Sequence, residues 1–404
     1  MINKIRKQDK YKLAILTSHP IQYYAPLYKR LASHPRIDLM AYYCSDYGIT
    51  KKFDPGFGVL FKWDTPLLEG YPYKFLKNIS PRPGPTWSLG LINPEIIKDL
   101  IQIHYDAIII QGYTLATNLI AYLTAWITRT PVIFRGETHD LSSPPRWIRM
   151  IKTPGLKVLF AGTQAFLSIG SASAKFYRSY GIEERKLFLT PYSVDNEYFM
   201  EKRKYYQFQR DDIKKELEIE KEKIVVIFSG KLIDRKRPMD LLLAFEKLDN
   251  KKRGVLIYIG DGEQKSMLRD YSKQKNIEDV MFLGFKNQSA LGRFYSVADI
   301  LVHPASFETW GLVINEIMCY GVPIITTNMV GSSFDLVRHG ENGFVSIPGD
   351  VDTLAKHLSL LISNEELRKR MGNKSLEIIS AWNYDVCVES ILNALLYVTK
   401  KKKG

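Results

Sequence analysis

The sequence predicts an α/β fold of two domains, each built on a parallel β-sheet. The chain has 404 residues, more than one hydrophobic core usually supports, so we expect two domains of roughly 200 residues. Apolar runs of strand length alternate with helical patterns, and this alternation restarts near residue 224, after a charge-rich segment at 201–223. Regular alternation of strand and helix is typical of parallel sheets, in which each strand returns through a helix.

In the first half of the chain, apolar runs and turn signals give the order of the elements. Residues 45–93 are rich in Gly, Pro and aromatic residues and are predicted to form a long irregular segment, which in a compact protein is usually functional or lid-like. Strands are expected at 12–18, 37–44, 106–111, 131–134 and 186–190, and helices at 26–32, 114–128 and 172–180.

The second half repeats this pattern. Residues 201–223 are charged and poor in small apolar residues, which predicts a linker and a surface helix. Strands are expected at 224–228, 255–259, 280–283, 300–303 and 324–326, helices at 289–297, 352–362 and 364–379, and a last helix with apolar spacing from Val386 to Leu396.

The most informative stretch contains two carboxylates, Glu308 and Glu316, eight positions apart. Between them lies Gly311, and an apolar run with helical spacing then continues to the stop signal Gly321. This pattern predicts a loop that leads into a helix, whose first N–H groups could hold a phosphate. Glu316 would lie about 7.5 Å along that helix, comparable with the reach from a pyrophosphate to a ribose. The alternative is an ordinary surface helix, in which Glu308 complements the macrodipole and Glu316 is solvated.

Two lysines follow the strand expected at 224–228. Gly230 permits a tight turn, and Lys231 and Lys236 place two cations near the carboxyl end of that strand, where they could neutralise a diphosphate. A solvated basic loop is the alternative. Gly260, in Gly-Asp-Gly after the next strand, lacks the third glycine of a dinucleotide fingerprint, which argues against a dehydrogenase.

The Glu308 motif continues into Gly321-x-Pro323, a strand, Gly331 and the run His-Gly-Glu-Asn-Gly-Phe at 339–344. Residues 307–344 together resemble the donor-binding segment of retaining nucleotide-sugar glycosyltransferases of family 4. The resemblance implies the GT-B architecture: two facing Rossmann-like domains, an interdomain cleft and a C-terminal helix that crosses back onto the first domain. The implied division is an acceptor-binding domain at 1–199, a linker at 200–222, a nucleotide-sugar-binding domain at 223–382, and a crossover helix with a basic tail at 383–404.

The resemblance also implies roles for individual residues. Glu308 would orient hydroxyls of the donor sugar, and Glu316 would bind the ribose. Lys231 stands where family members usually have Arg. His139, just past the strand at 131–134, matches a family histidine near the donor sugar, with a structural role as the alternative. The implied catalytic residues are His139, Glu308 and Lys236, and the implied donor-binding residues are Gly230, Lys231, Lys236, Gly260, Gly311, Leu312, Val313 and Glu316.

Candidate acceptor residues follow the first strand. Ser18, His19 and Gln22 lie at its carboxyl end, where open parallel sheets bind ligands, and we expect them to reach a bound sugar or acceptor. The family usually has a Gly-rich loop at this place, so the sequence departs from the common pattern. Alternatively, His19 caps the turn.

Composition narrows the partners and the location. The net charge of +14 calls for an anionic partner, and nucleotide phosphates, anionic lipids and nucleic acid all qualify, but no nucleic-acid recognition motif is present. No run of 18 apolar residues and no signal-peptide core appear, so a cytoplasmic location is expected. Three widely spaced cysteines predict neither a disulfide framework nor a zinc site.

A membrane contact is a further possibility. Basic, aromatic and aliphatic residues alternate over 144–160, which fits a helix on an anionic membrane surface equally as well as core packing with a solvated basic face. The Lys-rich end at 400–403 is either a solvated tail or a second membrane contact.

The predicted function is retaining transfer of a sugar from a nucleotide diphosphate sugar to a glycan or lipid-linked acceptor, in cell-surface polysaccharide or glycolipid synthesis. No Asp-x-Asp occurs in a suitable loop, and two lysines can replace a divalent cation, so neither a metal nor another cofactor is expected. A nucleotide-sugar epimerase or hydrolase, and a non-catalytic partner subunit that binds nucleotide sugar, are the alternatives.

Overall fold

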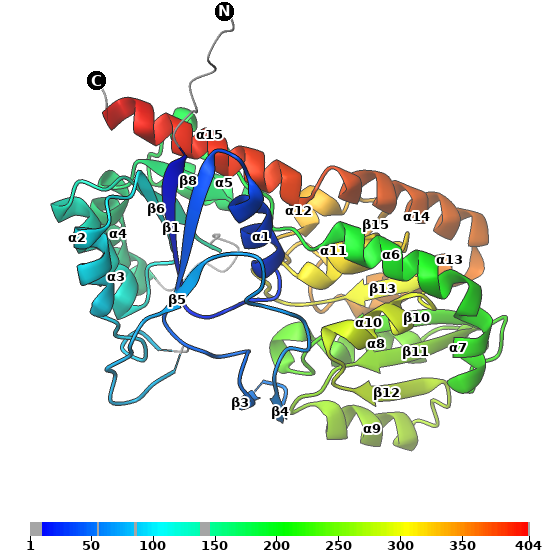
Figure 1. Cartoon of the computed structure of the whole chain (residues 1–404). Coiled ribbons are helices and arrows are strands. Elements are labelled where there is room, and N and C mark those ends of the chain that lie inside the picture. Colours follow the sequence, from blue (N-terminus) through cyan, green and yellow to red (C-terminus); the bar gives the residue numbers. More distant parts are fainter. Residues whose placement is uncertain (1–9, 55, 85–86, 138–145, 403–404) are drawn as a thin grey trace, which may run out of the picture.

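The computed structural model describes residues 10–54, 56–84, 87–137 and 146–402, which form two α/β domains side by side (Figure 1). Each domain contains one sheet, and all pairs of neighbouring strands in both sheets run parallel. The first sheet has the strand order β5-β2-β1-β6-β7-β8-β9, and the second has the order β12-β11-β10-β13-β14-β15. The predicted α/β fold with two parallel sheets is confirmed.

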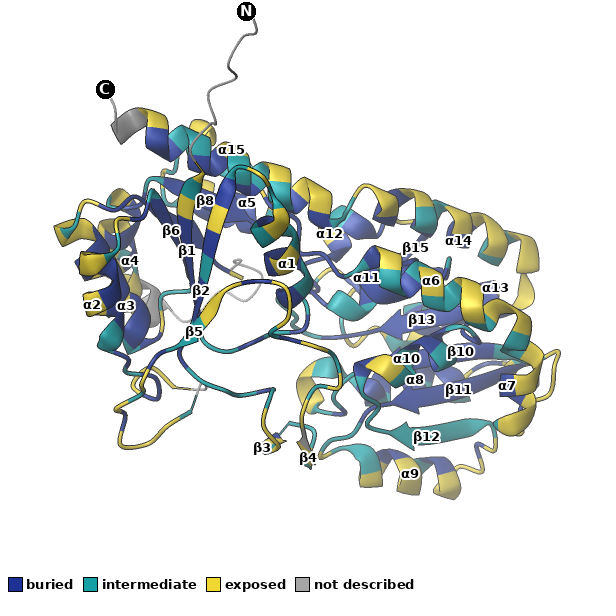
Figure 2. Cartoon of the chain, viewed as in Figure 1, coloured by how far each residue is buried: buried dark blue, intermediate teal, exposed yellow. Residues whose placement is uncertain are grey.

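The N-terminal sheet is formed by continuous apolar runs, as expected for parallel strands covered by helices on both faces. Its central strands are buried along almost their whole length (Figure 2). The strands are β1 (Tyr11–Thr17), β2 (Ile37–Tyr43), β5 (Tyr73–Phe75), β6 (Ala107–Gln111), β7 (Val132–Arg135), β8 (Ala165–Ser168) and β9 (Leu187–Leu189). The helices are α1 (Ala25–Ser33), α2 (Glu95–Gln102), α3 (Ala116–Ile127), α4 (Arg146–Ala161) and α5 (Ser171–Ser179), with the 3-10 turn η1 (Glu184–Lys186).

The C-terminal domain has the same layered construction. Its strands are β10 (Ile224–Ser229), β11 (Gly254–Ile259), β12 (Val280–Gly284), β13 (Ile300–His303), β14 (Ile324–Thr327) and β15 (Gly343–Ser346). Its helices are α8 (Pro238–Glu246), α9 (Lys265–Gln274), α10 (Gln288–Tyr295), α11 (Leu312–Met318), α12 (Ser333–Leu336), α13 (Val351–Ser363) and α14 (Glu365–Ser380), with the 3-10 turns η3 (Asp234–Lys236) and η4 (Lys251–Arg253). Most predicted elements therefore exist, with ends shifted by one or two residues.

Two predicted segments differ from expectation. The segment 45–93 is not wholly irregular: besides β5 it contains a short antiparallel hairpin, β3 (Lys52–Asp54) and β4 (Val59–Phe61). The predicted linker is largely helical, comprising most of α6 (Asn196–Tyr206), η2 (Gln207–Gln209) and α7 (Arg210–Glu216). Because α6 already packs against α10, the chain joins the C-terminal domain near Asn196.

The chain crosses between the domains twice, and both crossings meet at one carbonyl. After β9 it passes Tyr192 on its way to α6, and after α14 it returns through Trp382 into α15 (Tyr384–Lys402). The Tyr192 carbonyl accepts hydrogen bonds from Trp382 Nε1 at 3.2 Å and from Asn315 Nδ2 of α11 at 2.9 Å. Helix α15 then packs against α1, β8 and β9, so the predicted crossover helix is confirmed (Figure 1).

Within the described ranges, no helix has both the length and the apolar character needed to cross a bilayer.

Candidate functional site

Two loops of the C-terminal domain lie together because they follow neighbouring strands. β10 pairs with β13 in parallel, so the chain leaves both strands at the same edge of the sheet. The Ser306 N–H donates to the Arg235 carbonyl at 2.9 Å and fixes one loop against the other. This arrangement brings Lys236, at the end of η3, next to Glu308.

Lys236 and Glu308 form a largely buried ion pair between Nζ and Oε2. Burial lowers the pKa of Lys236, and Glu308 only partly reverses this. For Glu308, burial raises the pKa, but the charge and hydrogen bond of Lys236, together with His303 and Arg235, outweigh it and hold the pKa below the usual value. Arg235 Nη1 lies 3.3 Å from the same carboxylate oxygen. Removing one partner of a buried ion pair leaves the other charge uncompensated, so a single substitution of either residue is expected to lower stability as well.

The predicted loop and helix after Glu308 are confirmed. Gly311 has a φ of +89°, in the left-handed region that favours glycine, and it is the N-cap of α11. A Cβ there would lie 3.2 Å from Cγ1 of Val330. Leu312 and Val313 are the first two residues of the helix, where an α-helix leaves N–H groups without an intrahelical acceptor.

Glu316, on the same helix, is buried rather than solvated, so the surface-helix alternative is wrong. Its side chain is 2% exposed. Oε2 accepts a hydrogen bond from the Tyr295 hydroxyl at 2.8 Å, and Oε1 accepts one from the Tyr23 hydroxyl at 2.9 Å. Burial raises the pKa of Glu316 to about 7, although both tyrosine hydrogen bonds act in the opposite direction. Tyr23 belongs to the N-terminal domain, so the two domains meet at this carboxylate.

Lys231 also contacts the N-terminal domain. Its Nζ donates to both carboxylate oxygens of Asp54, at 2.7 and 3.0 Å, and lies 4.7 Å from the centroid of the Phe57 ring. Burial raises the pKa of Asp54, but the hydrogen bonds from Lys231 and from the Phe57 N–H, with the charge of Lys231, lower it by more. The net pKa is below the usual value, so the ionised carboxylate is favoured. The alternative of a solvated basic loop is therefore wrong for Lys231, whose charge is paired with Asp54.

Gly230 and Gly260 lie backbone to backbone at the ends of β10 and β11. A Cβ on Gly260 would lie 1.9 Å from the carbonyl oxygen of Gly230, which is closer than any side-chain atom can approach. The φ angle is +146° at Gly230 and +145° at Gly260. These glycines allow the loop that carries Lys231 to pass close over the neighbouring strand.

The three candidate acceptor residues do not share one contact. Ser18 Oγ and His19 Nδ1 lie 2.9 Å apart, and burial, aided by the charge of Lys52, lowers the pKa of His19 to about 4. Gln22 is buried and lines a separate cavity of about 230 Å³ between the domains, together with Tyr198 and Gln288. A neutral His19 beside Ser18 can exchange a hydrogen bond with a hydroxyl group.

His139 lies outside the described residues. The chain leading to it ends with a buried cation: Arg135 is 3% exposed, and its guanidinium lies 5.1 Å from the Tyr24 ring centroid and 5.8 Å from that of Tyr192. The Tyr24 hydroxyl donates to Oε1 of Glu137 at 2.5 Å. Stacked aromatic rings stabilise a desolvated guanidinium at the carboxyl end of β7.

Sequence reasoning missed four side chains that complete this region: Tyr23, Asp54, Tyr295 and His303. His303 ends β13 with no exposed surface, and burial together with the charge of Lys236 lowers its pKa to about 3. Only Tyr23 had a local signal, because it follows Gln22 in the turn after β1. The other three stand in ordinary strand, loop or helix patterns.

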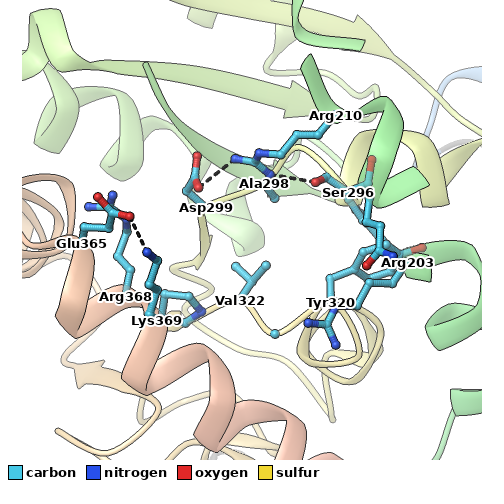
Figure 3. Close-up of a pocket in the computed structure, with 14 residues that line it drawn as sticks. Arg203, Arg210, Ser296, Ala298, Asp299, Tyr320, Val322, Glu365, Arg368 and Lys369 are labelled. Atoms are coloured by element: carbon cyan, nitrogen blue, oxygen red, sulfur yellow. Dashed lines mark hydrogen bonds and ion pairs between the residues drawn. The ribbon is translucent and has the colours of Figure 1, made fainter. Parts of the chain in front are cut away.

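A basic cavity lies at the other edge of the C-terminal sheet, where its strands begin (Figure 3). It has a volume of about 310 Å³ and is lined by residues that precede β13 and β14, such as Asp299 and Pro323, and by Arg203, Arg210 and Arg368. Arg210 is held by Asp299 at 2.8 Å and by the Ser296 carbonyl at 2.7 Å. The cavity is thus separate from the loops that carry Lys236 and Glu308. Among the residues that the structure describes, no group of His, Cys, Asp and Glu has the arrangement of a metal site.

A known protein family matches the C-terminal half of the chain. Residues 209–377 match the family model of glycosyl transferases group 1. N-acetyl-alpha-D-glucosaminyl L-malate synthase of Bacillus anthracis is 30% identical over 45% of this chain and 47% of its own length, so the match spans about half of that relative. The capsular polysaccharide biosynthesis glycosyltransferase CapM of Staphylococcus aureus is 26% identical over 69% of this chain and 74% of its own.

Solved structures extend the likeness to the whole fold. Anabaena HepE, in complex with UDP, superposes with a TM-score of 0.71 over 96% of this chain and 99% of its own, at 19% identity. The chain therefore has the GT-B fold of two Rossmann-like domains, and residues 209–377 within it are similar to glycosyl transferases group 1.

Proposed function

We propose that the protein is a retaining, metal-independent glycosyltransferase that moves a sugar from a nucleotide diphosphate sugar to a glycan or lipid-linked acceptor, in cell-surface polysaccharide or glycolipid synthesis. The observation that carries the proposal is the buried pair of Lys236 and Glu308 at the carboxyl edge of the C-terminal sheet, beside Gly311 and within the segment that matches the family model. Open parallel sheets bind ligands at this edge.

In this function, Lys231 and Lys236 stabilise the negative charge that develops on the leaving diphosphate, together with the N–H groups of Leu312 and Val313. Preorganised charges of this kind are usually the largest single contribution to catalysis, and they act more strongly in a site that excludes water. Two lysines supply charge that a divalent cation would otherwise provide. Glu308, next to Lys236, then orients hydroxyl groups of the donor sugar.

Glu316 accepts hydrogen bonds from the ribose. Its position on α11 supports this role, because the helix begins at Leu312 near the proposed phosphate position and carries Glu316 one turn further along. Gly230 and Gly260 shape the loop next to the nucleotide. HepE was solved with UDP, so uridine nucleotides are the first donors to test.

The acceptor approaches from the N-terminal domain, where Ser18, His19 and Gln22 lie. A role of His139 near the donor sugar stays a prediction, because that residue lies outside the described ranges. We propose that the acceptor attacks from the face that the diphosphate leaves, and that the leaving phosphate takes the acceptor proton. This same-face route requires no dedicated protein base and retains the anomeric configuration. Anomeric assignment of the product by NMR tests it, and inversion would contradict it.

We also propose that the protein works at an anionic membrane surface. Trp147, Met150 and Ile151 on α4 are 65%, 75% and 72% exposed, and they share one face of that helix by their spacing. Helices α2 and α3, which pack against each other, expose further apolar side chains, including Ile101 and Ile127. The charge of these two helices fits an anionic membrane surface. Helix α4 has basic residues but no acidic one, and α3 has no charged residue that lipid headgroups would repel.

Vesicle sedimentation tests the membrane contact. The protein is expected to sediment with vesicles of anionic lipid at low salt and to be released in part at high salt. The double variant Trp147→Ser, Ile151→Ser should lose this binding, whereas Phe208→Ser, which removes an even more exposed ring from η2 of the other domain, should keep it. Equal binding of the two variants, or no binding by the unaltered protein, would contradict the membrane surface.

Nucleotide binding tests the donor site directly. A thermal-shift screen with UDP, GDP, ADP and their sugars should identify one base, since a ligand at 100 times its Kd stabilises the folded protein by about 2.7 kcal/mol. Product analysis then separates the reaction classes. Free sugar or an epimer formed without acceptor would indicate a hydrolase or epimerase, and nucleotide-sugar binding without turnover on glycan or lipid acceptors would indicate a non-catalytic subunit.

A further inference from the structure

Two of the proposed donor-binding residues are already occupied by side chains from the opposite domain. Glu316 accepts the hydroxyl of Tyr23, and Lys231 binds the carboxylate of Asp54. These contacts join residues 293 and 177 positions apart in the chain. Each supplies the same type of group that the donor would supply at that position.

The chemical match is close for both partners. Asp54 presents an anion to Lys231 with two oxygens at 2.7 and 3.0 Å, as one phosphate of a nucleoside diphosphate would. Tyr23 presents a hydroxyl that donates to a carboxylate oxygen of Glu316 at 2.9 Å, as a ribose hydroxyl would. The second oxygen of Glu316 accepts a hydrogen bond from Tyr295 of its own domain. Tyr23 therefore contacts the oxygen that would otherwise accept a hydrogen bond from the ribose.

The Asp54 side of this arrangement is ordered by several further contacts. Oδ1 of Asp54 accepts hydrogen bonds from the N–H groups of Gly56 and Phe57 at 2.8 and 2.9 Å, and Oδ2 accepts one from the Tyr47 hydroxyl at 3.0 Å. The backbone passes so close to Lys231 that a Cβ on Gly56 would lie 2.6 Å from Nζ. The carboxylate is thus held in position for Lys231.

The same part of the N-terminal domain also contacts the loop that follows β12. The Phe57 ring lies 4.8 Å from the Phe285 ring, centroid to centroid. Asn287 Nδ2 donates to the Lys62 carbonyl at 2.7 Å, and Asp64 accepts from the Ser289 hydroxyl. Residues 54–64, as far as they are described, therefore follow the edge of the C-terminal sheet from Lys231 to α10.

We propose that Tyr23 and Asp54 close the donor site when it is empty, and that a nucleoside diphosphate sugar must displace them to bind. The diphosphate replaces the Asp54 carboxylate on Lys231, and the ribose replaces the Tyr23 hydroxyl on Glu316. This inference rests on the proposed function, since it takes Lys231 and Glu316 as donor-binding groups. Its consequence is that the N-terminal domain lowers donor affinity while protecting Lys231 and Glu316 from being left unpaired.

Two conservative variants test this competition. Tyr23→Phe removes only the hydroxyl, and Asp54→Asn removes the charge while Oδ1 can still accept from Gly56 and Phe57. In isothermal titration calorimetry, Tyr23→Phe should bind the nucleoside diphosphate about 2- to 12-fold more tightly than the unaltered protein, the range expected for removing one competing hydrogen bond. Asp54→Asn should tighten binding at least as much, because it removes a competing ion pair with Lys231. The Tm without nucleotide should fall in both, because an interdomain contact is lost.

Tyr295→Phe is the matched control, because it removes the other hydroxyl from Glu316 without affecting the interdomain contact. It should not tighten nucleotide binding. Weaker or unchanged nucleotide binding by both Tyr23→Phe and Asp54→Asn would overturn the inference while the unaltered protein still binds nucleotide. Failure of the unaltered protein to bind any nucleoside diphosphate would overturn the proposed function and this inference together, so the two failures are distinguishable.

Discussion

The two sides of the proposed site are built differently. On the C-terminal side, the functional groups stand on two short loops and one short helix, which follow neighbouring strands and are fixed to each other within a single domain. On the N-terminal side, Asp54 comes from a long segment between β2 and α2 and finds its main charged partner in the other domain. The positions of the groups on the C-terminal side are determined by their own sheet. The position of Asp54 on the N-terminal side depends on contact between the domains.

This difference has a physical consequence. Groups fixed within one sheet keep their geometry when the domains move, so they suit the part of the reaction in which charge must be stabilised without reorganisation. Groups that depend on an interdomain contact change position when the domains separate, so they suit binding and release. Substitutions on the two sides should therefore affect different measurements.

The largest effect is expected from the C-terminal side. Lys236→Ala removes a buried cation next to the proposed diphosphate, and a loss of about 2.7 kcal/mol of charge stabilisation corresponds to about a hundredfold lower kcat. Steady-state kinetics with a saturating donor measure it. Lys247→Ala, which removes an exposed lysine paired with Asp352 on the surface, is the control and should be near-neutral. Full activity of Lys236→Ala would show that charge stabilisation comes from elsewhere.

Glu316→Ala is expected to weaken nucleotide binding and to lower stability, because it leaves the buried hydroxyls of Tyr23 and Tyr295 without their acceptor. Leaving a buried polar group unsatisfied costs about 1–3 kcal/mol. Urea unfolding and nucleotide titration measure the two effects. Glu316→Gln keeps an acceptor and should be less destabilised, and unchanged nucleotide affinity in Glu316→Ala would remove this residue from the donor site.

The burial of Glu316 also predicts a pH dependence. Its pKa is about 7 in the folded protein, above the ordinary value of 4.5, so between these values the folded state binds more protons than the unfolded state. The contribution of this group to stability is therefore fully present below pH 4.5 and is lost as the pH rises toward 7, with a slope of up to about 1.4 kcal/mol per pH unit. The difference in unfolding free energy between the unaltered protein and Glu316→Gln, measured from pH 4.5 to 8, isolates it. The unfolding free energy of the unaltered protein minus that of Glu316→Gln should fall as the pH rises. A rise of this quantity with pH would contradict the prediction.

The smallest effect is expected at an exposed interdomain contact. Arg30 of α1 pairs with Glu197 of α6 and Asp385 of α15, both at 2.7 Å, and both acidic side chains are largely exposed. Exposed ion pairs contribute about 0–1 kcal/mol, so Arg30→Ala should lower the Tm only slightly and leave nucleotide affinity unchanged. A large change in affinity would show that the outer contact, and not only Tyr23 and Asp54, governs the site.

Sequence reasoning predicted the fold, and the loops and helix on the C-terminal side of the proposed site, because their signals are local. The strands are apolar runs, Gly311 marks the start of a helix, and Lys236 and Glu308 stand at the ends of neighbouring strands. The β3–β4 hairpin was missed because strands of three residues have no readable periodicity. Tyr23 and Asp54 were missed because their roles depend on partners 293 and 177 residues away, which no local pattern specifies. The interpretation of His139 stays a prediction, since that residue lies outside the described ranges.

The carbonyl of Tyr192 has a mechanical consequence for the whole molecule. Trp382 and Asn315 both donate to it, and the Trp310 and Trp382 rings stack beside it at a centroid distance of 5.7 Å. Both crossings between the domains and the helix that carries Glu316 are thereby joined at one backbone carbonyl. A displacement of the Tyr192 backbone would therefore disturb both crossings between the domains and the helix that carries Glu316 at the same time.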